Sequence, residues 1–348
     1  MRKLASIQVI YNIEPINGAD KIELARVLGW QCVVNKGQFK KYDRAVYFEI
    51  DSFLPIDPRF EFLRASSYKQ TDIMGEGFRL KTMKFRGEVS QGLLLPLSLF
   101  PEIPEDAPVG ADVTTLLGVR KWEIEERVTT GGTQIGELPK CVPHTDETRI
   151  QNAPELIEAF GSREYYISTK MDGSSHSICL DDDGFHVTGH NFEYKDDGKS
   201  AFYNFVNERG FREKLEAYAK SNNFQTVTVQ GEFCAPGIQK NRLRLTRPEW
   251  YVFTVICDSV RLRLWDMIYV CTLLGAEHVP IEEIGHNFPE KYPTVEAVLS
   301  RADGEYPRGG QKEGIVVRTT TPAYSDITDS RYLSFKAVSN KYLLKTDA

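Results

Sequence analysis

The sequence lacks the features that mark membrane and secreted proteins. None of its apolar runs approaches the roughly 20 residues that a helix needs to cross a bilayer. Its first residues, MRKLASIQVIYNIEP, carry two basic side chains but no apolar stretch of the kind found in secretory signals. These absences predict a soluble intracellular protein, cytoplasmic or nuclear, with no membrane partner.

Cysteine is also sparse, and it is not grouped. The six cysteines stand at positions 32, 141, 179, 234, 257 and 271, and no two of them form a Cys-x-x-Cys pair. This scatter argues against both a zinc site and a disulfide framework, and it fits a reducing compartment.

An overall excess of positive charge is missing too, since the formal net charge is −6. Nucleic-acid binding is not excluded, because it depends on local patches rather than on the total. Basic residues do gather in three places, which are 36–44, 240–247 and 336–345. Solvated surface charge is the ordinary alternative for each patch.

The first 120 residues consist of short β-branched or aromatic runs separated by Gly, Pro, Asn and Asp. The runs are LASIQVIYNIEPI, ARVLGWQCVV, RAVYFEI, FRLKTMKFRG and SQGLLLPL. Such spacing predicts a small OB-like barrel over 1–120, a fold that often binds oligonucleotides. A β-domain without a ligand is the alternative.

The remainder divides into a linker and a second, mixed domain, as the length of 348 residues suggests. Residues 121–140 are rich in charged residues, and their apolar residues follow no clear helical or strand spacing, which predicts a linker. Within 141–348, helices are expected over 152–161 and 200–222. Strands are expected over 164–170, 175–190, 226–233, 249–260, 313–320 and 331–337, with a hairpin turn at Asp183-Gly184. The class is α+β with antiparallel sheets.

The stretch YYISTKMDG, residues 165–173, places a lysine where a buried strand ends. Burial and neighbouring cations would lower the pKa of Lys170 and make its amine a nucleophile. Asp172 would share its face, and Gly173 allows a sharp exit. Alone, this pattern also fits an ordinary strand end with a solvated lysine.

Compatible residues occur in order around it. Arg149 precedes the Lys170 strand, Glu232 ends a strand before a Gly/Pro loop, and Phe253 lies within the next strand. Two more, Glu313 and Lys336, lie at strand ends near the C-terminus. Each alone could be a surface charge or a core aromatic, but the ordered set is hard to obtain by chance.

This set resembles the ordered motifs of covalent nucleotidyltransferases, which include DNA ligases, RNA ligases and mRNA capping enzymes. Three longer segments are similar to segments of ATP-dependent RNA ligases specifically, namely TDETRIQN, GEFCAPGIQKN and SFKAVSNKYLLK. Two segments of the N-terminal part resemble the N-terminal OB-like domain of the fifth RNA ligase family. They are GWQCVVNKGQFKKYDRAVYFEIDSFLP and LKTMKFRGEVSQGLLLPL. The resemblance implies an OB-like barrel followed by a nucleotidyltransferase domain at 141–348, ATP-grasp-like as in DNA and RNA ligases.

The resemblance also implies a reaction. Lys170 would attack the α-phosphate of ATP to form lysyl-AMP, AMP would pass to a 5′-phosphate, and a 3′-OH would then seal the strand. Mg²⁺ or Mn²⁺ would be held by three carboxylates, Asp172, Glu232 and Glu313. Lys336 would act as a second catalytic cation at the α-phosphate.

The nucleotide would contact several further side chains. Arg149 would bind a phosphate and Phe253 would stack on adenine. Many relatives have Ser-Arg-Asn where this chain has His190-Asn191, so His190 either replaces the arginine or is a structural histidine. Many ligases also have Lys-x-Lys where this chain has only Lys336, and Lys341 is a candidate for the second contact.

The expected substrates are RNA or RNA/DNA ends, at nicks in a duplex, in RNA repair, with no obligate protein partner. A DNA ligase or a capping-type guanylyltransferase is a rival, but these carry an OB domain after the last motif. Only 12 residues follow Lys336. A catalytically inactive nucleic-acid-binding protein is the other rival, and it would have no use for the full set of charged residues.

Overall fold

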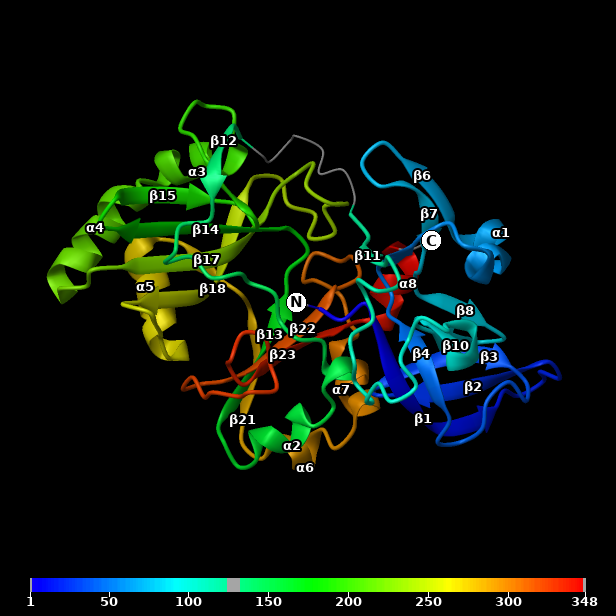
Figure 1. Ribbon diagram of the computed structural model, residues 1–348. Helices are drawn as coiled ribbons and strands as arrows, with labels where there is room; N and C mark the ends of the chain where they lie inside the picture. The colour runs from blue at the N-terminus through cyan, green and yellow to red at the C-terminus, as the bar shows by residue number, and fades with distance from the viewer. Residues whose placement is uncertain (1, 124–131, 347–348) are drawn as a thin grey trace. The chain divides into compact units, whose positions relative to one another are not determined.

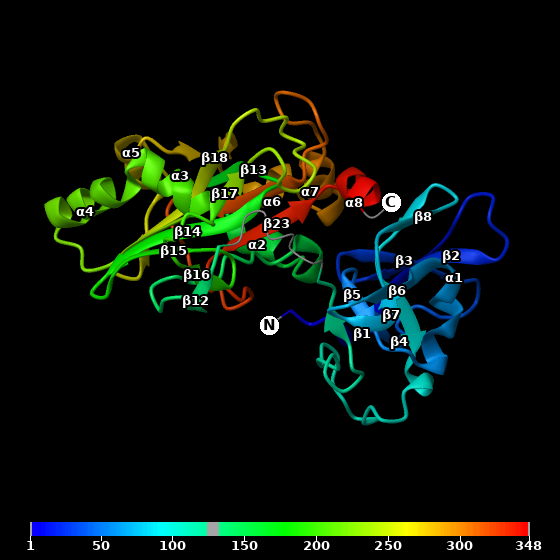
Figure 2. The ribbon, with the colours of Figure 1, turned by 90° about the horizontal axis from the view of Figure 1, so that it is seen from above.

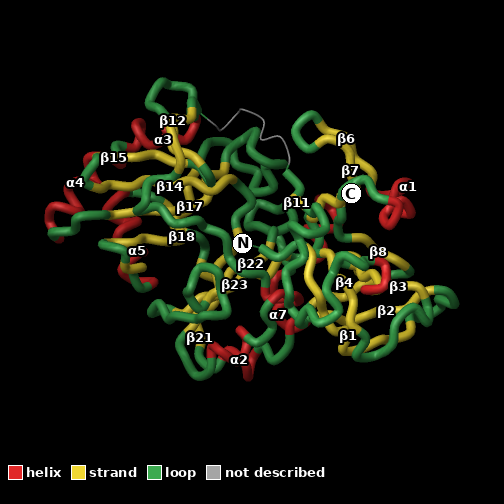
Figure 3. The backbone as a smooth tube through the Cα atoms, viewed as in Figure 1, coloured by secondary structure: helices red, strands yellow, loops and turns green. Residues whose placement is uncertain are grey.

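The computed structural model describes residues 2–123 and 132–346, and the chain folds into two compact units (Figure 1). The first unit holds residues 1–125 with 151–154 and 343–348, and the second holds 126–150 with 155–342. In each unit strands form the centre and helices are peripheral (Figure 3). None of the helices in the described residues is both long and apolar enough to cross a membrane.

The first unit is built from short antiparallel strands. Its main sheet has the order β10-β4-β1-β2-β3, with β1 Ala5–Pro15, β2 Ile22–Val27, β3 Trp30–Asn35, β4 Arg44–Phe48 and β10 Leu93–Pro96. A second sheet has the order β11-β5-β7-β6, with β5 Ser52–Leu54, β6 Tyr68–Thr71, β7 Gly75–Arg79 and β11 Arg120–Lys121. Strands β8 Met83–Phe85 and β9 Glu88–Ser90 form a hairpin, and η1 Pro58–Leu63, α1 Arg64–Ser67 and η2 Leu97–Leu99 complete the unit. Aromatic residues at its core, including Phe48, Phe60, Phe78 and Phe100, are almost wholly buried.

Two of the predicted β-runs in this unit are each divided between two strands. The run 25–34 spans β2 and β3, which are joined at Leu28 and Gly29, and Leu28 has the left-handed φ of 50°. The run 78–87 spans the end of β7 and all of β8. Neither run contains proline, asparagine or aspartate at its break, so composition alone does not reveal where the strand ends.

The second unit contains two antiparallel sheets. The larger has the order β12-β16-β15-β14-β17-β18-β19, with β20 pairing parallel to β18. Its strands are β12 Gln134–Glu137, β14 Ser174–Asp181, β15 Gly184–Thr188, β16 Phe192–Tyr194, β17 Val227–Cys234, β18 Glu249–Cys257, β19 Val260–Arg261 and β20 Glu277–His278. The smaller has the order β21-β13-β22-β23, with β13 Tyr165–Lys170, β21 Ile281–Gly285, β22 Gly314–Thr319 and β23 Ser334–Val338.

Helices cover each of these sheets. Helices α3 Ala201–Arg209, α4 Phe211–Asn222 and α5 Leu264–Leu274 pack on one face of the larger sheet around Phe202, Phe233 and Trp250 (Figure 2). Beside the smaller sheet lie α2 Leu156–Phe160, α6 Phe288–Lys291 and α7 Val295–Ala302, with the short η3 Ile150–Asn152 before α2. Helix α8 Asn340–Thr346 follows β23, and its residues from 343 onward belong to the first unit. Both predictions, the α+β class and the antiparallel sheets, are confirmed.

Several boundaries differ from prediction. The helix expected over 200–222 is two helices, because Gly210 has a left-handed φ of 61° and ends the first. The hairpin turn lies one residue earlier than expected, since Asp181 pairs with Gly184 and leaves Asp182-Asp183 as the loop. Helix α5 was not predicted, because it is apolar on almost every side and shows no helical period. The linker predicted over 121–140 contains Lys121 of β11 and all of β12, and its residues 124–131 lie outside the described part of the chain.

One prediction about cysteine is wrong. Cys141 and Cys179 are joined by a disulfide, whereas the other four cysteines are free and buried. The two partners lie 38 residues apart in sequence. Their meeting depends on segment 139–145 lying against the larger sheet, where Thr228 Oγ1 of β17 donates a hydrogen bond to the carbonyl of Cys141 at 2.9 Å. Sequence spacing carries no signal of that approach.

Candidate active site

Lys170 is the last residue of β13, where its ammonium meets a carboxylate. Its Nζ lies 2.8 Å from Oε1 of Glu313, and both side chains are largely buried. The pairing of β13 with β22 brings them together, since Lys170 is opposite Gly314. The Tyr306 hydroxyl fixes the same two residues, because it donates to the Lys170 carbonyl at 2.8 Å and accepts from the Glu313 backbone N–H at 3.2 Å.

The charge state of this lysine is set by competing effects. Burial lowers the pKa of Lys170, but the carboxylates of Glu313, Glu232 and Asp172 outweigh it, so the net pKa is raised. The expectation of a lowered pKa is therefore not met. Of the two predicted reasons for lowering the pKa, burial and neighbouring cations, only burial acts on Lys170, and three nearby carboxylates outweigh it.

Glu232 faces the same lysine from β17. Its Oε1 accepts a hydrogen bond from the Gly173 backbone N–H at 3.1 Å. Burial raises the pKa of Glu232 to about 7, with the negative charge of Glu313 adding to the effect and Lys170 opposing it. Glu232 and Glu313 are thus two partly buried carboxylates whose negative charges both act on the lysine ammonium.

Asp172 is placed differently from the other two predicted metal ligands. It is buried, its Oδ2 pairs with Nη1 of Arg242 at 2.5 Å, and its Oδ1 accepts a hydrogen bond from the Tyr342 hydroxyl at 2.8 Å. The Arg242 guanidinium also lies over the Tyr342 ring, 4.5 Å from its centroid. Both carboxylate oxygens of Asp172 are therefore bonded to protein side chains, and its role as a metal ligand stays a prediction.

A cavity of about 180 Å³ opens beside Lys170. Of the predicted site residues, Lys170, His190, Glu232, Phe253 and Lys336 line it. The lining is completed by residues that were not predicted, which are Thr145, Asp146, Glu147, Ser168, Thr169, Met171, Ser175, Val279, Val316 and Arg318. With an aromatic face, apolar walls and lysines together, the cavity suits a nucleotide.

Lys336 reaches the cavity from β23, beside a segment that precedes β13. Its backbone N–H donates to the Thr148 carbonyl at 2.8 Å, and Arg149 forms a parallel bridge with it. Within this segment, the carboxylate of Asp146 lies 3.9 Å from Lys336 Nζ and 3.5 Å from His190 Nε2. The structure thus brings Arg149, His190 and Lys336 into one neighbourhood. Arg149 and the exposed Asn191 are not among the residues that line the cavity.

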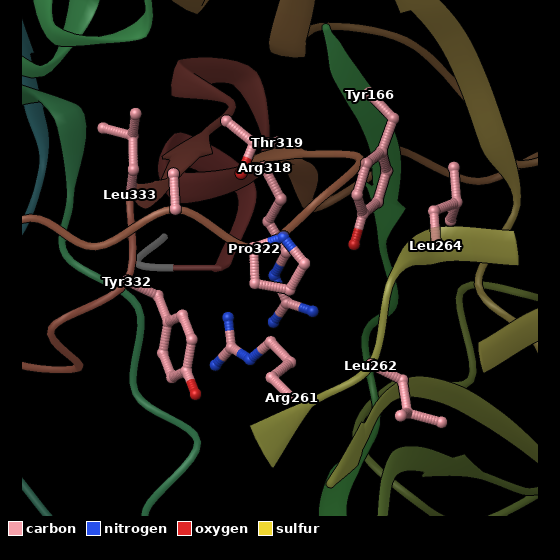
Figure 4. A pocket seen from close by; sticks show the side chains of 10 residues that line it. Tyr166, Arg261, Leu262, Leu264, Arg318, Thr319, Pro322, Tyr332 and Leu333 are labelled. Atoms are coloured by element: carbon pink, nitrogen blue, oxygen red, sulfur yellow. The ribbon is translucent and has the colours of Figure 1, made fainter. Parts of the chain in front are cut away.

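Glu147 and Arg318 form a buried ion pair that sequence reasoning missed. Arg318 Nη2 lies 2.7 Å from Glu147 Oε1, and Ser334 donates to the other oxygen at 2.5 Å. Burial raises the pKa of Glu147, but the guanidiniums of Arg318 and Arg261 outweigh it and lower the net value. Figure 4 shows that Arg261 lies close to Arg318 in a small neighbouring pocket. Burial, with repulsion from Arg318, lowers the pKa of Arg261 to about 10.

Comparison with known proteins gives two family matches. An OB-fold domain model matches residues 4–97, and an RNA ligase model matches residues 163–338. No curated protein sequence matches the chain significantly.

Solved structures of an RNA ligase from Naegleria gruberi are similar over nearly the whole chain. The complex with pyrophosphate is 33% identical, covers 99% of each chain and has a TM-score of 0.87. A variant with ATP and manganese is 33% identical, covers 100% of each chain and has a TM-score of 0.89. A variant with AMP and manganese is 33% identical, covers 99% of each chain and has a TM-score of 0.88.

The OB-fold match confirms the predicted barrel in the N-terminal part, and the second match confirms the ligase fold that follows it. The second match spans about half of the chain, and the Naegleria enzyme is 33% identical over 99% of it. The chain therefore belongs to the RNA ligase family.

Proposed function

We propose that this chain is an ATP-dependent RNA ligase that carries AMP on Lys170 and seals nicks in duplexes during RNA repair. The observation that supports this most directly is the position of Lys170. Its amine is held at a strand end, paired with Glu313 and acted on by Glu232, and it lines a cavity of about 180 Å³ together with Phe253 and Lys336. The Naegleria relative is described with ATP and with pyrophosphate, the substrate and leaving group of such a step, and with AMP and manganese.

The chemistry assigned to Lys170 is nucleophilic substitution at phosphorus. Its Nζ forms a bond to the α-phosphorus of ATP while the bond to pyrophosphate breaks, which leaves a phosphoramidate. The ammonium must first lose a proton, and Glu313 Oε1, at 2.8 Å, is the acceptor in contact with it. Lys336 stabilises the negative charge that develops on the phosphate oxygens. Arg149 and His190 are assigned to the phosphate or ribose, and Phe253 to the base.

The carboxylates beside Lys170 fit a divalent cation. Glu232 and Glu313 supply the oxygen donors that Mg²⁺ and Mn²⁺ prefer, and their charges act more strongly on Lys170 than that of Asp172. When bound, such a cation would neutralise part of their charge and withdraw electron density from the phosphate. Asp172, whose oxygens are already bonded to Arg242 and Tyr342, is assigned to holding this site together.

The decisive experiment is intact-protein mass spectrometry after incubation with ATP and Mg²⁺ or Mn²⁺. We expect the mass to increase by one AMP less one water in the wild type and in the control Lys220→Ala, which alters an exposed lysine of α4. No increase is expected for Lys170→Ala. An adduct with GTP in place of ATP would support the capping-type alternative, and no adduct on folded, uncharged protein with either would support the inactive binding protein.

The substrate assignment has its own test. Wild-type protein is supplied with ATP and 3′-OH and 5′-phosphate RNA ends, either at a nick in a duplex or on free single strands. We expect faster sealing at the nick. Equal rates on free strands would contradict the duplex assignment and leave the ligase assignment intact.

A further inference from the structure

Loop 235–248, between β17 and β18, is held in an unusual backbone conformation beside Lys170. Three of its residues, Gln239, Asn241 and Arg244, have φ between 43° and 52°, in the left-handed region that few non-glycine residues adopt. The Asn241 side chain stabilises the turn, because it bonds both the N–H and the carbonyl of Leu245 at 3.0 Å. Strain of this kind is common at functional sites.

The same loop is anchored to the catalytic motif. Leu243 and Leu245 are buried in a cluster with Met171, the residue after Lys170. Two residues that precede these leucines in the loop contact the same motif. Arg242 pairs with Asp172, and Gln239 donates to the Gly173 carbonyl at 3.3 Å. The loop is therefore fixed against the residues that follow Lys170.

A second loop, residues 303–313, approaches Lys170 from β22. Its Tyr306 donates to the Lys170 carbonyl, and a tight turn follows in which Gly309 N–H donates to the Tyr306 carbonyl at 2.8 Å. The two loops touch, since a methyl group placed on Gly309 would lie 2.9 Å from Nη1 of Arg244. Gly309, with φ of 82°, thus leaves room for the Arg244 guanidinium.

These loops present three exposed cations, Lys240, Arg244 and Arg308, which we call the basic rim. Among the described residues, none of the three forms an ion pair with a carboxylate. Their neighbours do, since Arg242 pairs with Asp172 and Arg247 with Glu249. Arg244 lies against Gly309, the residue that follows Arg308, so the two arginines lie on loop segments that touch, and neither forms an ion pair within the described residues. Such an arrangement is stabilised by a bound anion.

We propose that the basic rim binds backbone phosphates of the RNA strand that carries the 5′-phosphate end. This inference rests on the proposed function and assigns its polynucleotide-binding surface. The rim cations do not line the nucleotide cavity, where Lys336 is already available to the ATP phosphates. They lie instead on loops that contact Lys170, Asp172 and Gly173, beside which a 5′-phosphate must arrive to accept AMP. Guanidiniums suit this role because their planar donors match phosphate oxygens.

The test separates the two sources of phosphate, ATP and RNA. Arg244→Ala, Arg308→Ala and the double variant are compared with wild type and with Lys220→Ala, an exposed lysine of α4 that also forms no ion pair in the described structure. In the first arm, lysyl-AMP formation is followed with ATP and metal but no RNA. In the second arm, variants already charged with AMP are given nicked RNA duplex, and sealing is measured against RNA concentration and salt.

We expect rates and the KM for ATP within about twofold of wild type in the first arm. In the second arm, we expect the double variant to raise the KM for RNA about tenfold, and to flatten its salt dependence by about one charge per cation removed. Lys220→Ala should change neither arm. An increase in the KM for ATP would overturn the RNA assignment in favour of ATP phosphates. An unchanged KM for RNA, with normal adenylylation, would overturn the rim as a binding surface, whereas failure of adenylylation in the wild type would refute the proposed function itself.

Discussion

Glu147 and Arg318, 171 residues apart in sequence, form an ion pair in which both side chains are almost completely buried. Arg318 also donates to the carbonyl of Phe253 and to the hydroxyl of Thr254. One guanidinium thus joins the segment before β13 to strands β18 and β22. Because both members of the pair line the nucleotide cavity, they fix part of its wall by electrostatics as well as by packing.

Removing one member of this pair should leave an uncompensated buried charge. We expect Glu147→Ala to lower the free energy of unfolding by about 3–5 kcal/mol, measured by urea denaturation. The double variant Glu147→Ala/Arg318→Met should recover part of that loss, because no unpaired charge remains. A single variant as stable as wild type would contradict the burial of the pair.

Tyr306 is expected to position the nucleophile. Tyr306→Phe removes the hydroxyl that bonds the Lys170 carbonyl and the Glu313 N–H, which we expect to cost about 1–3 kcal/mol of stability. The rate of lysyl-AMP formation should fall about tenfold, because small displacements of reacting groups are costly. Tyr324→Phe, at an exposed tyrosine, is the control and should leave both quantities unchanged. Full adenylylation by Tyr306→Phe would show that the hydroxyl does not position Lys170.

His176 should make the protein sensitive to acid. Its ring is buried among Phe202, Phe233 and Tyr194, and burial lowers the pKa of His176 to about 4, although the Ser174 carbonyl opposes the effect. The unfolded chain, with a histidine pKa near 6.5, therefore binds the proton more readily than the folded one. Its stabilising contribution is present above about pH 6.5 and is lost as the pH falls toward 4, by about 3 kcal/mol in total.

The measurement is urea denaturation of wild type and His176→Phe between pH 4 and pH 8. The difference in unfolding free energy between the two should change between about pH 6.5 and pH 4 and be constant above about pH 6.5. Parallel pH curves for the two proteins would contradict the assignment to His176.

The Cys141–Cys179 disulfide should be detectable by labelling. After unfolding without reductant, alkylation should modify the four free cysteines, and all six after reduction. Reduction should also destabilise the protein by about 2–4 kcal/mol. The variant Cys141→Ser/Cys179→Ser should lose its response to reductant, and labelling of six cysteines without reductant would contradict the bond.

The sequence allowed the strand-end residues of the site to be predicted, because each is a charge that interrupts an apolar run. Lys170 and Glu232 are of this kind, at or near the ends of β13 and β17, whereas Lys336, also expected at a strand end, lies in the middle of β23. The fold class was predictable because the spacing of apolar residues and the positions of turn residues are local properties of the sequence. Phe253 lies within a strand, and its resemblance to a family motif was the signal that singled it out.

The residues that could not be predicted depend on contacts distant in sequence. Arg318 follows the apolar residues of β22, and its sequence position alone suggests a surface charge. Only the structure shows that it is buried against Glu147. Arg242 was seen only as part of a basic patch, although it is the buried partner of Asp172. The Cys141–Cys179 bond likewise arises from the packing of a segment without regular structure. The pattern of polar and apolar residues along the sequence does not indicate which distant residues will form such pairs.

The order of the strands has a consequence for synthesis. Lys336 belongs to β23, one of the last strands to leave the ribosome, and its partner segment around Arg149 precedes the nucleophile strand β13. A nascent chain can therefore complete much of the larger sheet before the cavity has its second lysine. Chains that terminate before β23 should be unable to take up AMP, which would restrict the reactive adenylate to fully translated molecules.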